Sequence, residues 1–479
     1  MTDAVGDGSL IPDRGSFRDR NNRVYDDGKQ IIRGVSAEAL ANWRALASES
    51  FFQELLDEGK VVATEQLERP IAPTDEWAGY LSHERIPFVT YPYEWSFGML
   101  RDAALLQLEL VERAFHAGWS MKDATAYNIQ WIGSRPVFID IPSFTPYRAG
   151  EPWVGYRQFC MQFLYPLMLQ AYKGVDFQPF LRADLEGVDP LLASRLLSGS
   201  TRLRKGVLTH VYLHAKMQAR YAGSELDEAK SLTENSGKQV SKSRKMHHSE
   251  AMVLGTIQGL KRLVNRLQPA QVRTTWGSYD TDHSYGDASF ETKKSFVERA
   301  VSSARRHLVW DLGCNTGTFS EICARHSDYV LSVDGDAKAI ERLYQAQKTK
   351  VGTNICPAIM NLANISPGQG WNGEERKAFD RRSRPNLVLC LALIHHIVIS
   401  ANIPLGAFLS WLRKLDSEVV LELVTLDDDM SKMLLRNREN QYGELTEAGF
   451  EAAISKMFRI VSSEPLKGGH RKLYHLVPV

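Results

Sequence analysis

The sequence predicts two parts of different fold class: an α/β fold in the C-terminal half and a separate α+β domain before it. Three observations support this prediction. The chain has 479 residues, more than one hydrophobic core usually organises. A segment rich in Ser, Lys and Glu lacks apolar periodicity, and short apolar runs alternate with helical patterns after it. We therefore predict an N-terminal domain over 1–222, a flexible linker over 223–250 and a C-terminal domain over 251–479.

The apolar runs of the C-terminal half predict a mainly parallel sheet. The strand candidates are 307–311, 329–334, 354–360, 386–394 and 418–424. Helical patterns separate or follow them at 317–326, 337–349, 374–380, 404–415, 428–439 and 446–457. Because parallel strands need long crossovers, this alternation is typical of a sheet covered by helices on both faces. The final run, "FRIVSSEPLKGGHRKLYHLV", has a central glycine turn and predicts an antiparallel hairpin at the sheet edge.

The composition is that of an ordinary globular chain, with 43% hydrophobic residues, 24% charged residues and a formal net charge of +1. A neutral total gives no long-range attraction to nucleic acid or membranes, so we expect neither as a partner unless a local patch supplies one. The start of the chain lacks a secretory signal pattern, and the longest apolar stretch, 387–399, is too short to span a bilayer. Five scattered cysteines without a C-x-x-C pair favour reduced thiols in a cytoplasmic protein, with no metal site.

The first strand of the C-terminal half ends in a glycine-flanked turn, "VWDLGCNTG". Asp311 closes the strand, and Gly313 and Gly317 flank the turn without a Cβ, so the backbone can approach a ligand closely there. Asn315 stands between them, and asparagine tolerates the left-handed conformation better than most residues. The pattern differs from G-x-G-x-x-G, which makes a dinucleotide pyrophosphate a poorer fit.

Two further groups complete a predicted nucleoside site. Asp334 ends the next strand, "YVLSVDGD", where a carboxylate can accept hydrogen bonds from both ribose hydroxyls of an adenosine ligand. After the third strand, Asn361 could meet an adenine edge and Leu362 its face. The carboxyl ends of parallel strands share one edge of a sheet, so we expect these groups to lie together.

These motifs, with "LVLCLALIHHI" at the fourth strand, resemble class I S-adenosylmethionine-dependent methyltransferases over roughly residues 275 to 479. The resemblance implies a Rossmann-like seven-stranded methyltransferase sheet whose last strand is antiparallel. It also implies that Asp311, Gly313, Asn315 and Gly317 cradle the methionine part of the cofactor, while Asp334 holds the ribose. A redox Rossmann domain and a non-catalytic fold are the alternatives.

The catalytic candidates are His395 and His396, at the carboxyl end of the fourth strand. An imidazole titrates near neutral pH and could take a proton from the methyl acceptor; alternatively, one histidine packs against the sheet or shapes the pocket. Glu422, in the fifth strand, is a second candidate base. The aromatic segment 274–290 could fold over the cofactor as a lid, or be a surface loop.

The N-terminal half contains a helical pattern over 97–119, then Asp123, Asn128 and a hairpin that ends on Asp140. This order resembles the core of protein-kinase-like phosphotransferases and implies that Asp123 orients a hydroxyl, while Asn128 and Asp140 bind Mg²⁺ if that domain is active. The chain departs from the pattern: it lacks the G-x-G-x-x-G loop, the histidine of the catalytic loop and the D-F-G sequence. An α+β substrate-recognition domain is the alternative.

The function predicted is a methyltransferase that uses S-adenosyl-L-methionine and acts on a small-molecule or saccharide acceptor. The alternatives are a bifunctional or phosphotransferase protein and a non-catalytic nucleotide-sensing scaffold. The basic run "KQVSKSRKMHH" and the amphipathic pattern after it could form a nucleic-acid arm, but a solvated linker with a docking helix fits the neutral total charge better.

Overall fold

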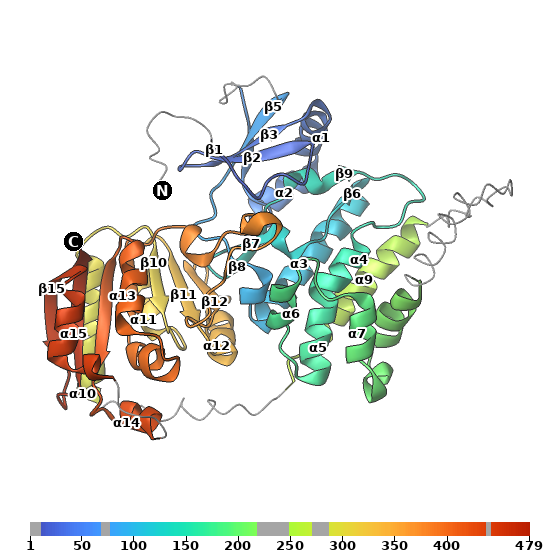
Figure 1. Ribbon diagram of the computed structural model, residues 1–479. Helices are drawn as coiled ribbons and strands as arrows, with labels where there is room; N and C mark the ends of the chain where they lie inside the picture. Colours follow the sequence, from blue (N-terminus) through green and yellow to red (C-terminus); the bar gives the residue numbers. More distant parts are fainter. Residues whose placement is uncertain (1–10, 69–76, 218–248, 271–286, 437–441) are drawn as a thin grey trace, which may run out of the picture.

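The computed structural model describes residues 11–68, 77–217, 249–270, 287–436 and 442–479 (Figure 1). The predicted linker, up to residue 248, and most of the predicted lid segment lie outside these residues. The five cysteines are all buried and unpaired. None of the described helices is long and apolar enough to cross a membrane.

The C-terminal half is built on a seven-stranded sheet in the order β12-β11-β10-β13-β14-β16-β15. Neighbouring strands from β12 to β14 are parallel, and β16 is antiparallel to both β14 and β15. The predicted parallel sheet and its antiparallel last strand are therefore confirmed. The strands are β10 (Val309–Leu312), β11 (Val330–Asp334), β12 (Ile355–Ile359), β13 (Leu387–Cys390), β14 (Glu418–Val424), β15 (Phe458–Pro465) and β16 (Arg471–Pro478).

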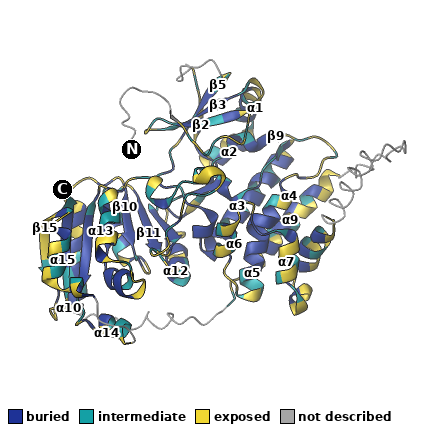
Figure 2. Ribbon diagram, in the orientation of Figure 1, coloured by how far each residue is buried: buried dark blue, intermediate teal, exposed yellow. Residues whose placement is uncertain are grey.

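The C-terminal hairpin forms the edge of the sheet, as predicted, with its second strand in the inner position. The apolar strand β16 lies between β14 and β15, where Leu473, Tyr474 and Leu476 are fully buried. The polar strand β15 forms the exposed edge at the left of Figure 2. The more apolar of the two strands therefore takes the inner position, because it gains more from burial.

Helices cover the sheet at most of the predicted places. They are α10 (Asp287–Ser302), α11 (Thr318–Ala324), α12 (Ala337–Gln347), α13 (Leu405–Lys414), α14 (Asp429–Leu435) and α15 (Glu447–Ile454). The helix predicted over 374–380 is wrong. That connection between β12 and β13 contains only short 3-10 turns at Trp371–Gly373 and Phe379–Arg381, because Gly370, Asn372 and Gly373 adopt positive φ and break the periodicity.

The N-terminal half begins with an antiparallel sheet in the order β1-β2-β3-β5-β4. Its strands are β1 (Ile11–Pro12), β2 (Asn22–Asp26), β3 (Ile31–Val35), β4 (Thr64–Leu67) and β5 (Gly79–His83), with α1 (Ala37–Ala47) and α2 (Ser50–Asp57) between β3 and β4. The predicted long helix is α3 (Phe97–His116), and the predicted hairpin is β7 (Ile129–Ile132) with β8 (Arg135–Phe138). Strand β6 (Trp119–Met121) pairs with β9 (Phe144–Pro146) beside them.

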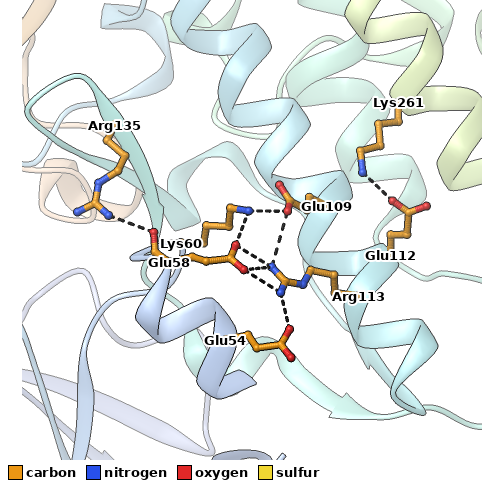
Figure 3. A network of polar contacts seen from close by, with 8 residues as sticks. All are labelled: Glu54, Glu58, Lys60, Glu109, Glu112, Arg113, Arg135 and Lys261. Atoms are coloured by element: carbon orange, nitrogen blue, oxygen red, sulfur yellow. Dashed lines mark hydrogen bonds and ion pairs between the residues drawn. The ribbon is translucent and has the colours of Figure 1, made fainter. Parts of the chain in front are cut away.

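Further helices complete this half, to the right of α3 and below it in Figure 1. They are α4 (Tyr156–Phe159), α5 (Tyr165–Lys173), α6 (Gln178–Ala183), α7 (Pro190–Leu196) and α9 (Glu250–Arg266). Although α9 follows the predicted linker, it packs against α3, and Lys261 forms an ion pair with Glu112 at 2.7 Å. Figure 3 shows this pair beside a second network in which Arg113 of α3 binds Glu54 and Glu58. These charges tie α2 and α9 to the same central helix.

The two halves share one apolar core. Tyr329 of the C-terminal half donates a hydrogen bond to the Trp131 carbonyl at 2.9 Å, and the Trp131 ring lies edge-on to Tyr344. Tyr344 in turn donates to Asp102 of α3 at 2.6 Å. One continuous cluster of buried residues therefore runs from α3 into the sheet around Trp310.

A buried ion pair lies at this junction. Arg382 donates to both carboxylate oxygens of Glu94, at 2.7 and 2.8 Å, and both side chains are 1% exposed. Ser366 also donates to Glu94, and the Arg382 guanidinium stacks on the Tyr91 ring at 3.9 Å. Arg382 and Ser366 belong to the connection between β12 and β13, so this irregular segment is held in place by the N-terminal half.

Substituting Arg382→Met should lower the free energy of unfolding by about 3–5 kcal/mol, because Glu94 would stay buried without its cation. Urea unfolding of the full chain measures the change. The double variant Glu94→Gln/Arg382→Met should lose much less free energy of unfolding, since neither buried charge remains. As a control, Arg14→Ala removes an exposed ion pair with Glu374 and should cost less than about 1 kcal/mol. Equal effects of Arg382→Met and Arg14→Ala would contradict the structural role of the buried pair.

Candidate functional site

The glycine-flanked turn adopts the conformation that its residues predict. Gly313, Asn315 and Gly317 all have positive φ, at 80°, 49° and 88°. The amides of Gly313 and Cys314 donate to the Val333 carbonyl at 2.8 and 3.0 Å, which holds the turn against the end of β11. A Cβ on Gly317 would lie 2.5 Å from the Leu343 side chain. The turn is therefore a rigid loop that presents backbone to its surroundings.

Asp334 lies at the centre of this arrangement. Its carboxylate accepts the Asn315 amide at 2.8 Å through one oxygen and the Asp336 amide at 2.8 Å through the other. Burial raises the pKa of Asp334, while these amide donors act in the opposite direction. Asp334 is a residue of intermediate exposure, and its carboxylate fixes the loop to the end of β11.

Asp311 lies below the loop. It is 2% exposed, and its carboxylate accepts the Ser320 hydroxyl at 2.6 Å, which in turn accepts the Ser332 hydroxyl at 2.8 Å. Burial raises the pKa of Asp311 to about 7, and the nearby Asp334 adds to that rise. The Asp311 carboxylate is enclosed by protein. A ligand at this edge could therefore contact Asp311 only through its backbone.

Asn361 and Leu362 follow β12 at the same edge of the sheet. The amide of Met360 donates to the Asp334 carbonyl at 2.8 Å, which places this segment next to the loop. Asn361 is exposed and accepts the Ala363 amide at 2.9 Å, while Leu362 is partly buried against the core. The ends of β10, β11 and β12 thus bring the predicted cofactor residues to one edge of the sheet.

The two histidines lie at the end of β13 on this edge. Their rings are in contact, with centroids 4.3 Å apart and planes tilted by 41°. His395 is 1% exposed, and its Nδ1 has no hydrogen-bond partner among the described residues. Burial lowers the pKa of His395 to about 2, with further lowering from His396, Arg471 and Lys293. Burial and Arg471 also lower the pKa of His396. Both imidazoles are therefore neutral at physiological pH and keep a lone pair.

Glu422 is enclosed by partners, which argues against the general-base role considered for it. Its carboxylate contacts Lys293 at 2.8 Å and Arg471 at 3.3 Å through one oxygen, and accepts the Ala392 amide at 2.9 Å through the other. Ala392 has a φ of 48° and turns the chain toward the histidines. Glu422 thus holds the turn that precedes His395.

Sequence reasoning missed both cations of this network, Arg471 and Lys293. Lys293 is 2% exposed in α10, on the same helical stripe as the buried Phe296, Val297 and Ala300. A lysine in an apolar stripe was a usable signal, because a buried ammonium needs a partner. The partner, Glu422, could be identified only from the fold.

The N-terminal candidates meet in a second polar cluster. Asn128 donates to Asp140 at 3.3 Å, and Arg33 of β3 forms an ion pair with Asp140 at 2.8 Å. Burial raises the pKa of Asp123, and the charge of Asp140 adds to that rise. The sequence did not indicate Arg33, which is 107 residues from Asp140. Among the described residues, no group of three or more His, Cys, Asp or Glu side chains could hold a metal ion.

Comparison with known proteins gives one match along nearly the whole chain. The nodulation protein NoeA of Rhizobium meliloti (strain 1021) is 31% identical over 464 residues, which cover 96% of this chain and 94% of NoeA. No family model matches. Among solved structures, the N-methyltransferase NodS of Bradyrhizobium japonicum WM9 is 14% identical over 40% of this chain and 97% of NodS, with a TM-score of 0.30. Magnesium protoporphyrin IX methyltransferase (ChlM) of Synechocystis PCC 6803 is 17% identical over 46% of this chain and 95% of ChlM, also with a TM-score of 0.30.

The buried carboxyl group of Asp311 predicts a pH dependence of stability. Because its pKa is higher in the folded state than the value of about 3.9 in an unfolded chain, the stabilising contribution is complete below about pH 4 and is lost as the pH rises toward 7. Relative to the neutral variant Asp311→Asn, the free energy of unfolding of the wild type should therefore fall by up to about 1.4 kcal/mol per pH unit in that interval. Urea unfolding of both proteins between pH 4 and 8 measures this difference. A difference that stays constant with pH would contradict the raised pKa.

Proposed function

The chain belongs to the family of the nodulation protein NoeA, and we propose that it is an S-adenosyl-L-methionine-dependent methyltransferase. The observation that carries the proposal is the left-handed loop of Gly313, Asn315 and Gly317, tied to the carboxylate of Asp334. This loop lies at the carboxyl ends of β10 and β11, the edge at which open α/β sheets bind their ligands.

The residues at this edge fit an adenosine-containing cofactor. Gly313 leaves room for close approach, since a Cβ there would have no neighbour nearer than 3.5 Å and only its positive φ demands glycine. Asp334 would hold the ribose hydroxyls, Asn361 and Leu362 would border the adenine, and the loop backbone with Asp311 below it would border the methionine part. When bound, S-adenosylmethionine supplies a methyl group on a positively charged sulfur.

His395 and His396 are the proposed catalytic residues. Because burial lowers the pKa of His395 to about 2, proton removal from the hydroxyl or amine that is methylated is assigned to His396. The unpartnered Nδ1 of His395 is suited to a hydrogen bond with the substrate, since a buried polar atom without a partner gains from one. Glu422 and Lys293 position the two rings through the Ala392 turn.

The proposed acceptor is a small molecule or a saccharide, and the name of the related nodulation protein NoeA supports a proposed role in nodulation. The buried, unpaired cysteines fit the reducing cytoplasm, which is the proposed location. The proposed S-adenosylmethionine site lies entirely in the C-terminal half. The N-terminal half is therefore available to bind the methyl acceptor or to catalyse a second reaction.

A phosphotransferase in the N-terminal half is a second candidate. The observation that favours it is the convergence of Asp123, Asn128 and Asp140. Arg33 pairs with the Asp140 carboxylate and would have to release it for Mg²⁺. Asn128 and Asp140 are oxygen ligands of the kind that Mg²⁺ prefers. Titration of the full chain with ATP and Mg²⁺ tests this candidate: turnover that is lost in Asp123→Ala and Asp140→Asn would support a bifunctional enzyme, and binding of neither nucleotide nor metal would exclude it.

The methyltransferase proposal predicts that Asp334→Ala weakens S-adenosylmethionine binding by about 1.5–3 kcal/mol, the scale of hydrogen bonds to a charged group. Isothermal titration calorimetry of the full chain measures the affinity, and circular dichroism verifies that the variant is folded. The matched control is Asp140→Asn, which changes a carboxylate of the other half and should leave this affinity intact. Unchanged binding in a folded Asp334→Ala variant, or no binding by the wild type, would refute the site.

A further inference from the structure

The stretch from Pro190 to Met217 concentrates positive charge on the surface. It contains five exposed cations, Arg195, Arg202, Arg204, Lys205 and Lys216, and no Asp or Glu. None of the five forms an ion pair with a carboxylate among the described residues. Because the whole chain carries a formal net charge of only +1, this surface differs sharply from the average.

The same stretch exposes large apolar side chains. Leu203 is 93% exposed and Leu208 is 61% exposed, and Leu191, Leu192, Leu213 and Met217 are exposed by 40–50%. Leu203 is flanked in sequence by Arg202 and Arg204. Water contact with so many large apolar groups in one short stretch is unfavourable, and such a surface usually has a partner.

Most of these residues lie in three elements that pack on one another, while Arg204 and Lys205 lie between the second and third elements and Lys216 and Met217 follow the third. Helix α7 and the 3-10 helix η5 (Gly199–Leu203) both contact the π-helix η6 (Val207–Leu213). Tyr212 of η6 donates a hydrogen bond to the Ser194 carbonyl of α7 at 2.7 Å. They lie at the outer end of the helical layer, where Figure 2 shows exposed residues along α7. We call the exposed cations and apolar residues of 190–217 the basic–apolar surface.

We propose that the basic–apolar surface binds an anionic phospholipid bilayer. Lysine and arginine are attracted to anionic headgroups, and leucine side chains between them can enter the headgroup–acyl boundary. Such binding is peripheral and needs no helix that crosses the membrane. The nearly neutral total charge predicts no membrane partner. That total hides this surface, because the positive charge here is cancelled by negative charge elsewhere in the chain.

The aromatic residues of this region argue against a nucleic acid as the partner. Arg202 covers the Tyr212 ring at 4.6 Å, and Arg204 lies over the Tyr172 ring at 5.9 Å. Single-stranded nucleic acids are bound largely by bases stacking on open aromatic rings. Here the exposed apolar side chains are aliphatic. Contact with a phosphate backbone does not remove them from water favourably, whereas insertion among lipid acyl chains does.

The test is co-sedimentation of the full chain with vesicles of phosphatidylcholine alone and of phosphatidylcholine mixed with phosphatidylglycerol. We expect binding to the mixed vesicles, weaker binding at high salt, and little binding to phosphatidylcholine. Each lost cation should reduce partitioning about five-fold, so Arg202→Gln/Arg204→Gln should reduce it by more than one order of magnitude. Leu203→Asp should reduce it further, because a carboxylate opposes both insertion and headgroup attraction.

Matched controls separate this surface from general effects. Val351 is also fully exposed but stands outside the basic–apolar surface, so Val351→Asp should bind like the wild type. Arg20→Gln/Lys29→Gln removes two exposed cations from the N-terminal sheet region and should weaken binding much less than Arg202→Gln/Arg204→Gln. Absence of binding to mixed vesicles, or equal binding by Leu203→Asp and Val351→Asp, would overturn the proposal. Self-association that Leu203→Asp disrupts, without vesicle binding, would identify the surface as a contact between two copies.

Discussion

The ion pair between Glu94 and Arg382 is the interaction on which the arrangement of the two halves depends. Two charges almost fully withdrawn from water are tolerated only where each is satisfied, and here the bidentate contact, the Ser366 hydroxyl and the Tyr91 ring provide this. The pair fixes the connection between β12 and β13. That connection also extends to the first strands of the chain, where Glu375 binds Arg18 at 2.6 and 2.9 Å.

At the candidate active site, buried or partly buried carboxylates also fix the structure, because each of them accepts hydrogen bonds from a neighbouring loop, helix or turn. Asp334 holds the glycine loop, Asp311 holds the helix after that loop through Ser320, and Glu422 holds the turn before the histidines. Each carboxylate therefore defines the shape of one wall of the site. The imidazoles of His395 and His396 are the groups left with acceptor capacity, since nearby cations and burial keep them neutral.

The sequence pattern correctly predicted those features that depend only on residues close together in the chain. The positive φ of Gly313, Asn315 and Gly317 follows from residue type, and alternating apolar runs were enough to locate the parallel strands. Long-range partners were not predictable in this way. Arg33 and Lys293 acquire their roles from carboxylates far along the chain. The segment around 374–380 has a helical pattern, but it is flanked by short 3-10 turns and is bound to the other half through Glu375 and Arg18. The sequence placed Asp311 and Asp334 alike at strand ends, whereas Asp311 lies inside β10 and is buried and Asp334 ends β11 with intermediate exposure.

The separation of Glu94 and Arg382 by 288 residues sets the order in which the molecule can be completed during synthesis. The N-terminal half leaves the ribosome first, with Glu94 and the aromatic face around Trp131 still open to water. At about 5–20 residues per second, roughly 15 to 60 seconds pass before Arg382 has been added. During that time the nascent chain displays an interface that only its own later portion can cover. The fold thus contains a built-in interval of exposure to chaperones, which ends when the connection between β12 and β13 emerges.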